Sequence, residues 1–570
     1  MELLEVKYLN FAYPGGEEVL KDVSFSVKNG EFVVLCGASG CGKSTLLKLL
    51  KRELAPTGNC QGEIWYMGKR QEELDDRTAA CEIGFVMQNP EHQIVTDKVW
   101  HELAFGLESM GMEQQLMRRR TAETADFFGL SRLFRQNTHE LSGGQKQLLN
   151  LASIMAMRPR LLILDEPTSQ LDPIAASNFI STLLKLNREF GIAVLMTEHR
   201  LEEVLPMADR VAVMEKGHLL LYDTPKQVCT QLPKEKSASR ILAGFPAAVR
   251  IYQALKGTGI CPLTVREGQE FLKKNYQNHK VSSLMKTEAY SEFKHAKTVL
   301  SLKDVWFRYG REHMDVLENV SLELREGEIV SILGGNGSGK TTLLGVIANL
   351  NRAYKGKIRI LEKKQKVYKG KDLYVRCLSF LPQNPQLVFL RDTVWEDLQE
   401  IRKVMGYSVS EMEEKAKMAA ELLGITHLLQ RHPYDLSGGE QQKAAIAKIL
   451  LLEPKILLLD EPTKGIDASA KQQLLEILKN LKKRGTAILM VTHDVEFAAE
   501  SSDRCGMVFD REIISIEETT GFFAKNQFYT TAANRIGQVL YDNPVTCQDV
   551  VELCLENGVR TSGAGGEDES

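Results

Sequence analysis

Two glycine-rich segments carry the residue types that bind phosphate. GASGCGKST begins at Gly37 and GGNGSGKTT begins at Gly334, and each follows a short apolar stretch that predicts a β-strand. Glycines let a backbone approach an anion closely, and the lysine and hydroxyl residue supply a cation for the outer phosphates and a ligand for magnesium. Each segment leads into a leucine-rich helix pattern, whose N-terminus adds N–H donors. Both segments therefore predict a nucleotide phosphate site.

We expect every residue of the two loops to contact the nucleotide. The first set is Gly37, Ala38, Ser39, Gly40, Cys41, Gly42, Lys43, Ser44 and Thr45. The second set is Gly334, Gly335, Asn336, Gly337, Ser338, Gly339, Lys340, Thr341 and Thr342. Within them, Ser44 and Thr341 are the predicted magnesium ligands.

Two acidic pairs stand at the ends of apolar strand patterns. LLILDEPT contains Asp165 and Glu166, and KILLLDEPT contains Asp460 and Glu461. The first carboxylate of each pair can reach magnesium, and the second can polarise water as a general base, which typically contributes about 10²–10⁴-fold to a rate. A surface acidic pair is the alternative interpretation, and the motifs that flank each pair along the chain argue against it.

The chain repeats itself. Lys43 and Lys340 are 297 residues apart, and the serines of two LSGG segments, Ser142 and Ser437, are 295 residues apart. Small residues ahead of a helix pattern make a second anion-binding N-terminus. The duplicated order and spacing predict two copies of one α/β domain.

This pattern resembles the ATP-binding-cassette (ABC) ATPase family. LSGGQ at Leu141 and LSGGE at Leu436 narrow the choice among phosphate-loop NTPases, and the match covers about four-fifths of the chain, with each landmark present twice and in order. The resemblance implies two P-loop NTPase nucleotide-binding domains. Each would have a RecA-like core, an antiparallel β subdomain, an α-helical subdomain and a short helical tail. Glu440 replaces the usual glutamine, as it does in active family members.

The resemblance also implies roles for residues beyond the loops. Gln88 and Gln383 are similar to the Q-loop glutamines, which sense magnesium and contact transport partners. His199 and His493 are similar to the switch histidines and would act in catalysis.

Other landmarks follow the same resemblance. The segments that end in Asp172 and Asp467 look like D-loops, while His92, His101 and His139 have no such match. Tyr13 and Tyr309 occupy the positions where the family stacks a ring on adenine. Simple core aromatics are the alternative for these two tyrosines.

In this family the two domains pack head to tail, which implies composite ATP sites. Lys43 would share one ATP with Ser437, Gly438, Gly439 and Glu440. Lys340 would share the other with Ser142, Gly143, Gly144 and Gln145. Both sites keep lysine, glutamate and histidine, so we expect an intramolecular pseudo-dimer with two competent sites.

The repeat predicts the domain order. We expect a first nucleotide-binding domain at 1–230, a helical tail and basic linker at 231–297, a second nucleotide-binding domain at 298–518, a helical tail at 519–560 and a disordered tail at 561–570. The tails are recognised from AAVRIYQAL at Ala247 and AANRIGQVL at Ala532. The linker is polar and lacks a clear amphipathic period.

Composition restricts the location. Of 570 residues, 43% are hydrophobic and 26% are charged, and no stretch reaches the roughly 18 apolar residues of a membrane helix. The N-terminus lacks a secretory pattern, and the ten cysteines lack metal or redox C-x-x-C spacing, so we expect reduced thiols. These features predict a cytoplasmic chain without a transmembrane segment. A peripheral position at the cytoplasmic face of the membrane is implied only by the resemblance to transporter ATPases.

The segments after Gln88 and Gln383, together with FYTTAANRIGQ at Phe528, resemble the ATPase subunits of energy-coupling-factor (ECF) importers. That resemblance implies a transmembrane coupling protein, a separate substrate-capture membrane protein, and a vitamin, vitamin precursor or transition-metal ion as cargo. The sequence does not identify the cargo, and import rather than export rests on the resemblance alone.

The rival interpretation is a soluble ABC-F type ATPase that binds ribosomes. Residues 231–297 hold 12 Lys or Arg and 5 Asp or Glu, and basic segments suit a phosphate backbone. Because much of this region repeats as a tail, a solvated helical surface explains the charge. A DNA-repair ATPase is disfavoured by the lack of zinc cysteines and long coiled coils, and we expect no nucleic-acid partner.

Overall fold

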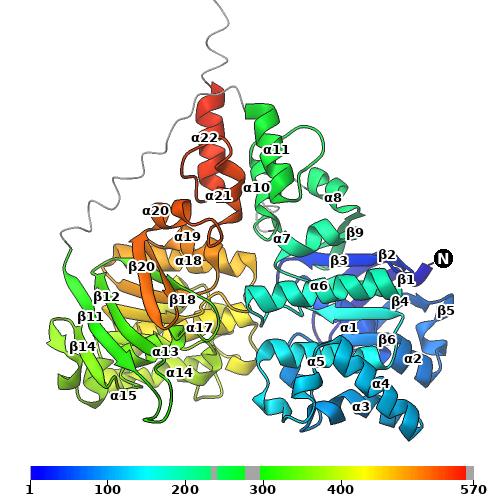
Figure 1. Ribbon diagram of the computed structural model, residues 1–570, viewed down its shortest axis with the longest axis horizontal. Coiled ribbons are helices and arrows are strands. Elements are labelled where there is room, and N and C mark those ends of the chain that lie inside the picture. Colours follow the sequence, from blue (N-terminus) through cyan, green and yellow to red (C-terminus); the bar gives the residue numbers. More distant parts are fainter. Residues whose placement is uncertain (1, 233–240, 277–295, 560–570) are drawn as a thin grey trace, which may run out of the picture. The chain divides into compact units, whose positions relative to one another are not determined.

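The computed structural model describes residues 2–232, 241–276 and 296–559. It divides into two compact units, one of Met1–Glu267 with Asp467–Ser469 and one of Gly268–Ile466 with Ala470–Ser570 (Figure 1). Residues 233–240 and 277–295 of the predicted tail and linker, together with the whole predicted disordered tail, lie outside the described residues.

A six-stranded sheet forms the core of the first unit, in the order β10-β9-β3-β8-β7-β6. Every neighbouring pair is parallel except β9 and β10. The central strands are apolar along their length, as strands covered on both faces are. The strand bounds are β3 Phe32–Gly37, β6 Ile83–Val86, β7 Leu161–Asp165, β8 Ala193–Thr197, β9 Arg210–Glu215 and β10 His218–Asp223.

Two helices beside this sheet begin at residues that the sequence assigns to the nucleotide site. Helix α1 (Lys43–Leu49) follows β3 through the glycine-rich loop. Helix α6 (Pro173–Phe190) begins with Asp172, whose carboxylate accepts a hydrogen bond from the Ala175 N–H, and ends at Gly191 in a left-handed conformation. The sequence therefore supplies both the start and the end signal of α6.

Two smaller subdomains complete the first unit. An antiparallel sheet has the order β2-β1-β4-β5, with β1 Glu2–Ala12, β2 Glu18–Lys28, β4 Asn59–Tyr66 and β5 Lys69–Arg70. A helical subdomain consists of α3 Val99–Ser109, α4 Gln114–Phe127 and α5 Gly143–Ala156, which pack on one another. The helix α2 (Asp76–Glu82) leads into β6.

The second unit repeats this architecture with a parallel core sheet in the order β16-β17-β18-β13-β19-β20. Its strands are β13 Ile329–Leu333, β16 Leu378–Leu381, β17 Ile456–Asp460, β18 Ala487–Thr492, β19 Arg504–Phe509 and β20 Glu512–Glu518. As in the first unit, the last strand is antiparallel to its neighbour.

An antiparallel sheet of the second unit has the order β12-β11-β14-β15, with β11 Thr298–Phe307, β12 Leu317–Arg325, β14 Lys355–Ile360 and β15 Lys363–Lys364. The main helices are α13 Lys340–Ile347, α16 Val409–Leu422, α17 Gly438–Leu450 and α18 Ala468–Lys483. Where the first unit has the single helix α3, the second has two short ones, α14 Val394–Gln399 and α15 Ile401–Met405.

Within each core, a short helix connects two strands, α7 Leu201–Val204 between β8 and β9 and α19 Val495–Ser501 between β18 and β19. Further helices follow each core. They are α8 Pro225–Gln231, α10 Ala247–Ala254 and α11 Val265–Tyr276 after the first, and α20 Thr519–Lys525, α21 Ala532–Gly537 and α22 Cys547–Val559 after the second. None of the helices in the described part of the chain is long and apolar enough to cross a membrane.

Candidate nucleotide-binding sites

The phosphate loop of the first unit turns around the Lys43 ammonium. Lys43 Nζ donates hydrogen bonds to the carbonyl oxygens of Gly37 at 2.8 Å and Ala38 at 3.1 Å. Gly42, just before α1, has a φ of 102°, and a Cβ there would lie 2.8 Å from Leu20. The loop therefore needs glycine at this point, and it surrounds a buried cation suited to phosphate.

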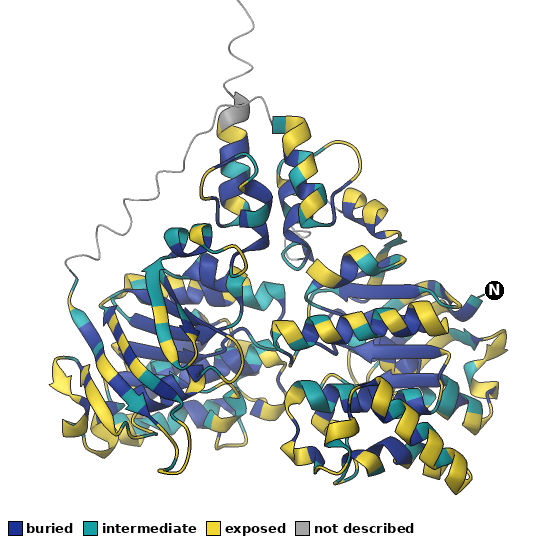
Figure 2. Ribbon diagram, viewed as in Figure 1, coloured by how far each residue is buried: buried dark blue, intermediate teal, exposed yellow. Residues whose placement is uncertain are grey.

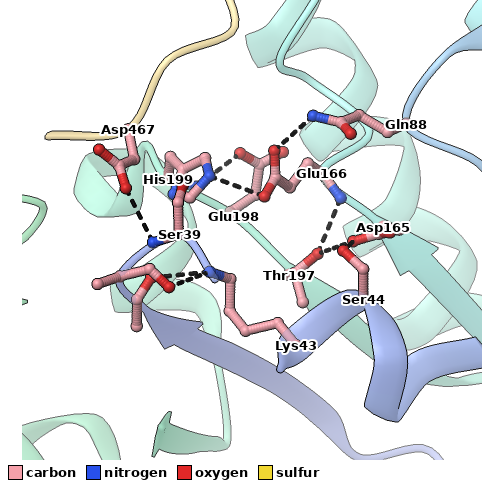
Figure 3. A network of polar contacts seen from close by, with 12 residues as sticks. Ser39, Lys43, Ser44, Gln88, Asp165, Glu166, Thr197, Glu198, His199 and Asp467 are labelled. Atoms are coloured by element: carbon pink, nitrogen blue, oxygen red, sulfur yellow. Dashed lines mark hydrogen bonds and ion pairs between the residues drawn. The ribbon is translucent and has the colours of Figure 1, made fainter. Parts of the chain in front are cut away.

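The predicted magnesium ligands of the first unit lie side by side. Ser44 Oγ donates to Asp165 Oδ1 at 3.0 Å, and Thr197 Oγ1 donates to the same oxygen at 2.9 Å (Figure 3). Asp165 and Thr197 face each other in the pairing of β7 with β8, which explains their proximity. Burial raises the pKa of Asp165 above its usual value, and the Ser44 hydrogen bond opposes the rise.

The predicted base Glu166 is held by two other predicted site residues. His199 Nε2 lies 2.7 Å from Glu166 Oε1, and Gln88 Nε2 donates to Glu166 Oε2 at 2.7 Å (Figure 3). Burial alone would raise the pKa of Glu166, but the hydrogen bond with His199 and the charges of His199 and Lys43 bring it below the usual value. The structure therefore joins the base, the switch histidine and the Q-loop glutamine in one network.

Two further carboxylates accept hydrogen bonds from residues of this site. Glu198 is buried and accepts hydrogen bonds from the N–H groups of Thr168 at 3.0 Å and His199 at 3.2 Å. Burial raises the pKa of Glu198. Asp467, which groups with the first unit, accepts a hydrogen bond from the Ser39 N–H at 2.8 Å.

The second unit builds its phosphate loop in the same way. Lys340 Nζ donates to the carbonyl oxygens of Gly334 and Gly335, both at 2.9 Å. Thr341 Oγ1 donates to Asp460 Oδ1 at 3.1 Å. Burial raises the pKa of Asp460 to about 6, and the Thr341 hydrogen bond opposes the rise.

The second predicted base is held differently. His493 Nδ1 lies 2.8 Å from Glu461 Oε2, and the His493 N–H donates to the same oxygen at 3.2 Å. Lys340 Nζ lies 4.0 Å from Glu461 Oε1. Within the described residues, Gln383 makes no side-chain hydrogen bond to Glu461, in contrast to Gln88 and Glu166.

Both bases adopt an unusual backbone conformation. The φ angles of Glu166 and Glu461 are 45° and 47°, in the left-handed region that residues with a Cβ seldom occupy. The Glu166 N–H donates to Thr197 Oγ1, and the Glu461 N–H donates to the carbonyl of Val491, both at 2.9 Å. Strain of this kind persists where surrounding contacts impose it, and it concentrates at functional sites.

The predicted adenine-stacking tyrosines lie beside the phosphate-loop helices. Tyr13 Oη is 3.1 Å from Thr45 Oγ1, and Tyr309 Oη is 3.1 Å from Thr342 Oγ1. Their rings remain exposed, 41% for Tyr13 and 64% for Tyr309. A ring that projects into solvent next to a phosphate loop has a free face for a base.

The LSGG segments start helices, as expected. Ser142 and Gln145 form a capping box at the start of α5, and Ser437 and Glu440 form one at the start of α17. Glutamate therefore performs the same capping as glutamine, and the serine of each segment is exposed.

Sequence reasoning missed two residues of the first site, Thr197 and Glu198. They directly precede His199, in the segment TEH. The corresponding segment of the second half is VTH, which ends at His493. Comparing these two segments would have drawn attention to a hydroxyl and a carboxylate that have no counterpart in the second half. Their partners, Asp165 and Thr168, are distant in sequence and become visible only in the fold.

The oxygen atoms present suit magnesium. Each site brings together one hydroxyl and one carboxylate, and hard cations prefer oxygen ligands. The described residues contain no cluster of three or more His, Cys, Asp or Glu side chains that could hold a metal by themselves. This fits magnesium, which is usually bound by one or two carboxylates together with phosphate oxygens and water.

Comparisons with known proteins agree with this geometry. A family model described as ABC transporter matches residues 20–169 and 317–464. A putative ABC transporter ATP-binding protein of Bacillus anthracis is 39% identical over 556 residues, which cover 96% of this chain and 98% of that protein. A putative HMP/thiamine import ATP-binding protein of Bacillus subtilis is 33% identical over 513 residues, covering 89% of this chain and 90% of the relative.

Among solved structures, cbiO1 from Clostridium perfringens, described as part of the ABC transporter complex cbiONQ, is 31% identical. It covers 40% of this chain and 91% of its own, with a TM-score of 0.38. The family match lies on both phosphate loops and reaches past both acidic pairs. The chain therefore belongs to the ABC transporter ATP-binding family, as a tandem member with two cassettes, and this family hydrolyses ATP to drive transport together with transmembrane partners.

Proposed function

We propose that this chain is the ATPase subunit of an ECF-type importer, bound at the cytoplasmic face of the membrane. Its partners would be a transmembrane coupling protein and a substrate-capture membrane protein. The cargo would be a vitamin, a vitamin precursor or a transition-metal ion. The relative named for HMP/thiamine import, which aligns with 89% of the chain, favours the vitamin class.

The observation that carries the proposal is the contact between Gln88 and Glu166. Gln88 Nε2 donates to the Glu166 carboxylate at 2.7 Å, and the next residue, Asn89, starts a short helical turn by accepting from the Glu91 N–H at 3.0 Å. A movement of this segment by a membrane partner would therefore displace a group bound directly to the base. Such a link is what coupling of transport to hydrolysis requires.

Exposed apolar residues follow the Q-loop glutamine in both units. Val95 is 68% exposed and Trp100 is 44% exposed in the first unit, and Leu387 and Leu390 are 71% and 73% exposed in the second. Apolar side chains gathered in water-facing segments mark interaction surfaces. We assign these surfaces to the coupling protein.

The chemistry that we propose at each site follows from the contacts. Lys43 and Lys340 bind the outer phosphates, and Ser44, Asp165, Thr341 and Asp460, with Gln88 and Gln383, bind magnesium. The magnesium ion would neutralise phosphate charge when bound. Glu166 and Glu461 accept the proton of the attacking water, and His199 and His493 orient them. Tyr13 and Tyr309 stack on adenine.

We also propose that the exposed N-termini of α5 and α17 bind the γ-phosphate of the ATP held by the other cassette. Ser142 and Gly143, like Ser437 and Gly438, are exposed. Each stands at the start of a helix of more than three turns, where free N–H groups favour an anion. If both Ser142→Arg and Ser437→Arg left ATP hydrolysis unchanged, this assignment would be wrong.

The test of the proposed function is isolation of the tagged chain from its native membranes in mild detergent, followed by mass spectrometry. We expect a multi-span coupling protein and a small hydrophobic capture protein. A matched preparation of Val95→Asp/Trp100→Asp should lose the coupling protein while its soluble ATP binding persists. Recovery of ribosomes without any membrane protein would move the assignment to translation.

A further inference from the structure

The antiparallel sheet of the second unit presents a row of cations to solvent. Lys355, Lys357 and Arg359 occupy alternate positions of β14 and are exposed, whereas Ile358 and Ile360, on either side of Arg359, are buried. Alternate residues of a strand point to opposite faces. One face of β14 therefore packs on the core while the other carries only basic side chains.

Neighbouring strands extend this row. Lys303 on β11 is paired with Lys357, and Lys364 on β15 is paired with Arg359. Directly opposed residues share a face, so these two exposed lysines lie beside the cations of β14. We refer to Lys303, Lys355, Lys357, Arg359 and Lys364 as the basic sheet face. Figure 2 shows exposed residues along β14 and the hairpin that follows it.

Further lysines surround the basic sheet face, and few acids oppose it. Exposed lysines after β14 are Lys363, Lys366, Lys369 and Lys371. Among the described residues, three acids are nearby. Glu362 pairs with Lys297 at 2.9 Å, Glu323 of β12 stands in the same cross-strand row as Arg359, and Asp304 is exposed next to Lys303 on β11. The face thus keeps a large excess of positive charge.

The equivalent sheet of the first unit is electrically balanced. Gly62 and Gly356 mark equivalent positions, with φ angles of 107° and 102°. The residue after Gly62 is Glu63, which is paired with Lys7 across the strands and forms an ion pair with Arg70. The residue after Gly356 is Lys357.

This difference costs the second sheet stability. A lysine opposite a glutamate is favourable, whereas like charges directly opposite each other are destabilising. Lys303 opposite Lys357 is such a like-charge pair. The stability of the sheet therefore does not explain why these cations are gathered on one face, whereas binding of an anionic partner would.

We propose that the basic sheet face binds the anionic headgroups of a lipid bilayer and holds the second unit against the membrane surface. The inference rests on the proposed function only in taking the chain to a membrane. A sheet face of long flexible cations fits a laterally extended layer of negative charge. Basic residues near an anionic leaflet each strengthen binding, within about one Debye length of the surface.

The aromatic residues at the edge of the face argue against single-stranded nucleic acid as the partner. Base binding of that kind uses free aromatic rings as stacking platforms. Here Lys355 Nζ lies over the Trp306 ring at 4.6 Å from its centroid, and the Arg308 guanidinium lies over Tyr354 at 4.8 Å. Each ring already has a cation on one side.

The test is flotation of the purified full-length chain with phosphatidylcholine vesicles that contain or lack phosphatidylglycerol. We expect binding only to the anionic vesicles and its loss at high salt. The variant Lys355→Gln/Lys357→Glu/Arg359→Trp, which copies Gln61, Glu63 and Trp65 of the first sheet, should bind at least about 100-fold more weakly, since each cation contributes roughly fivefold.

Two further variants make the test specific. Lys479→Glu/Lys483→Glu changes two exposed lysines of α18, produces the same change in net charge, and should bind as the parent does. Lys357→Glu alone recreates the Lys–Glu pair of the first sheet, so it should be at least as stable as the parent yet bind roughly 25-fold more weakly. Thermal unfolding and ATP hydrolysis in detergent-free solution check that each variant is folded.

The outcomes separate this inference from the proposed function, because the vesicles contain no membrane protein. Absence of binding to anionic vesicles, or equal binding by the parent and the Lys357→Glu variant, would overturn the inference and leave the pull-down of a coupling protein unaffected. Binding to a short single-stranded RNA without binding to vesicles would overturn it in favour of a nucleic-acid surface.

Discussion

The two carboxylates that we propose as general bases have nearly the same backbone conformation, but different neighbours hold them. Glu166 is fixed by His199, by Gln88 and, through its N–H, by the hydroxyl of Thr197. Glu461 is fixed by His493 and by a main-chain carbonyl. The reacting residues were thus kept in both halves while their supports diverged.

This comparison separates two kinds of requirement. In our proposal the phosphate loops bind the nucleotide, the acidic pairs bind magnesium and accept a proton from water, and the switch histidines orient the bases. Both halves keep all of these residues. The residues that hold the bases in place can differ between the halves as long as each backbone N–H group has an acceptor, whether a side chain or a carbonyl. We therefore expect two working sites whose sensitivities to mutation differ.

The largest effect should come from removing the bases. Glu166→Gln and Glu461→Gln keep the size of the side chain but lose its ability to accept a proton, so each should abolish turnover at its own site. The double variant should hydrolyse ATP about 10²–10⁴-fold more slowly while still binding it. Steady-state hydrolysis and nucleotide binding measure this, and a double variant with the parental rate would show that other groups act as bases.

Asp460 provides the next largest effect, on stability. Its pKa is raised from 3.8 to about 6, so the folded state binds more protons than the unfolded state between these values. The associated stability is fully present below about pH 4 and is lost as the pH rises through about 6. Asp460→Asn removes the buried charge, so in metal-free buffer at pH 8 it should stabilise the chain by up to about 3 kcal/mol.

Thermal unfolding of parent and variant between pH 4 and pH 8 measures this. The difference should shrink towards pH 4, where Asp460 is already protonated. Asp165→Asn is the matched variant and should change stability in the same direction, because burial also raises the pKa of Asp165. A gain that does not depend on pH would mean that charge burial is not its cause.

A smaller effect is expected from Glu198, which exists only in the first site. Glu198→Thr, the residue of the second half, removes two acceptors from buried N–H groups, including that of His199. We expect about tenfold slower turnover at the first site with an unchanged KM for ATP. Single-turnover measurements in a Glu461→Gln background isolate that site.

Glu198→Gln keeps one acceptor for the Thr168 N–H and should restore part of the rate. Equal rates for Glu198→Thr and the parent in this background would show that His199 is positioned without Glu198.

The smallest effect should follow from exchanging Thr197 and Val491. Thr197→Val removes the hydroxyl that donates to Asp165 and accepts from the Glu166 N–H. The loss of one or two such hydrogen bonds should lower activity a few-fold, and only at the first site. Val491→Thr adds the hydroxyl to the second site and should lower the pKa of Asp460. The pH dependence of thermal unfolding would show this as a weaker rise in stability below pH 6.

The sequence was sufficient for the fold class and for the residues that stand in continuous motifs. Lys43 with Ser44, and Asp165 with Glu166, could be predicted because a few adjacent residues determine both their backbone and their chemistry. It was insufficient for Glu198 and for the basic sheet face. Their meaning depends on pairing across strands, where residues such as Lys303 and Lys357, far apart in the chain, become neighbours.

For the same reason, the like-charge pair of Lys303 and Lys357 could not be recognised in the sequence. Lysines between Lys355 and Lys371 are interrupted by glycine, apolar residues and Glu362, so the segment does not stand out as a charge run. Only the alternation of exposed and buried residues along β14 sorts its cations onto one face.

The left-handed φ of the two bases has a practical consequence for imaging the ATP-bound state. Replacing each base with its isosteric amide would hold ATP but keep the strained backbone. Asparagine and glycine occupy this region more readily than glutamate does. Glu166→Asn with Glu461→Asn would therefore remove both carboxylates and relax both backbones, giving a captured complex with a higher melting temperature than its glutamine equivalent and a longer working life on the grid or in the crystal.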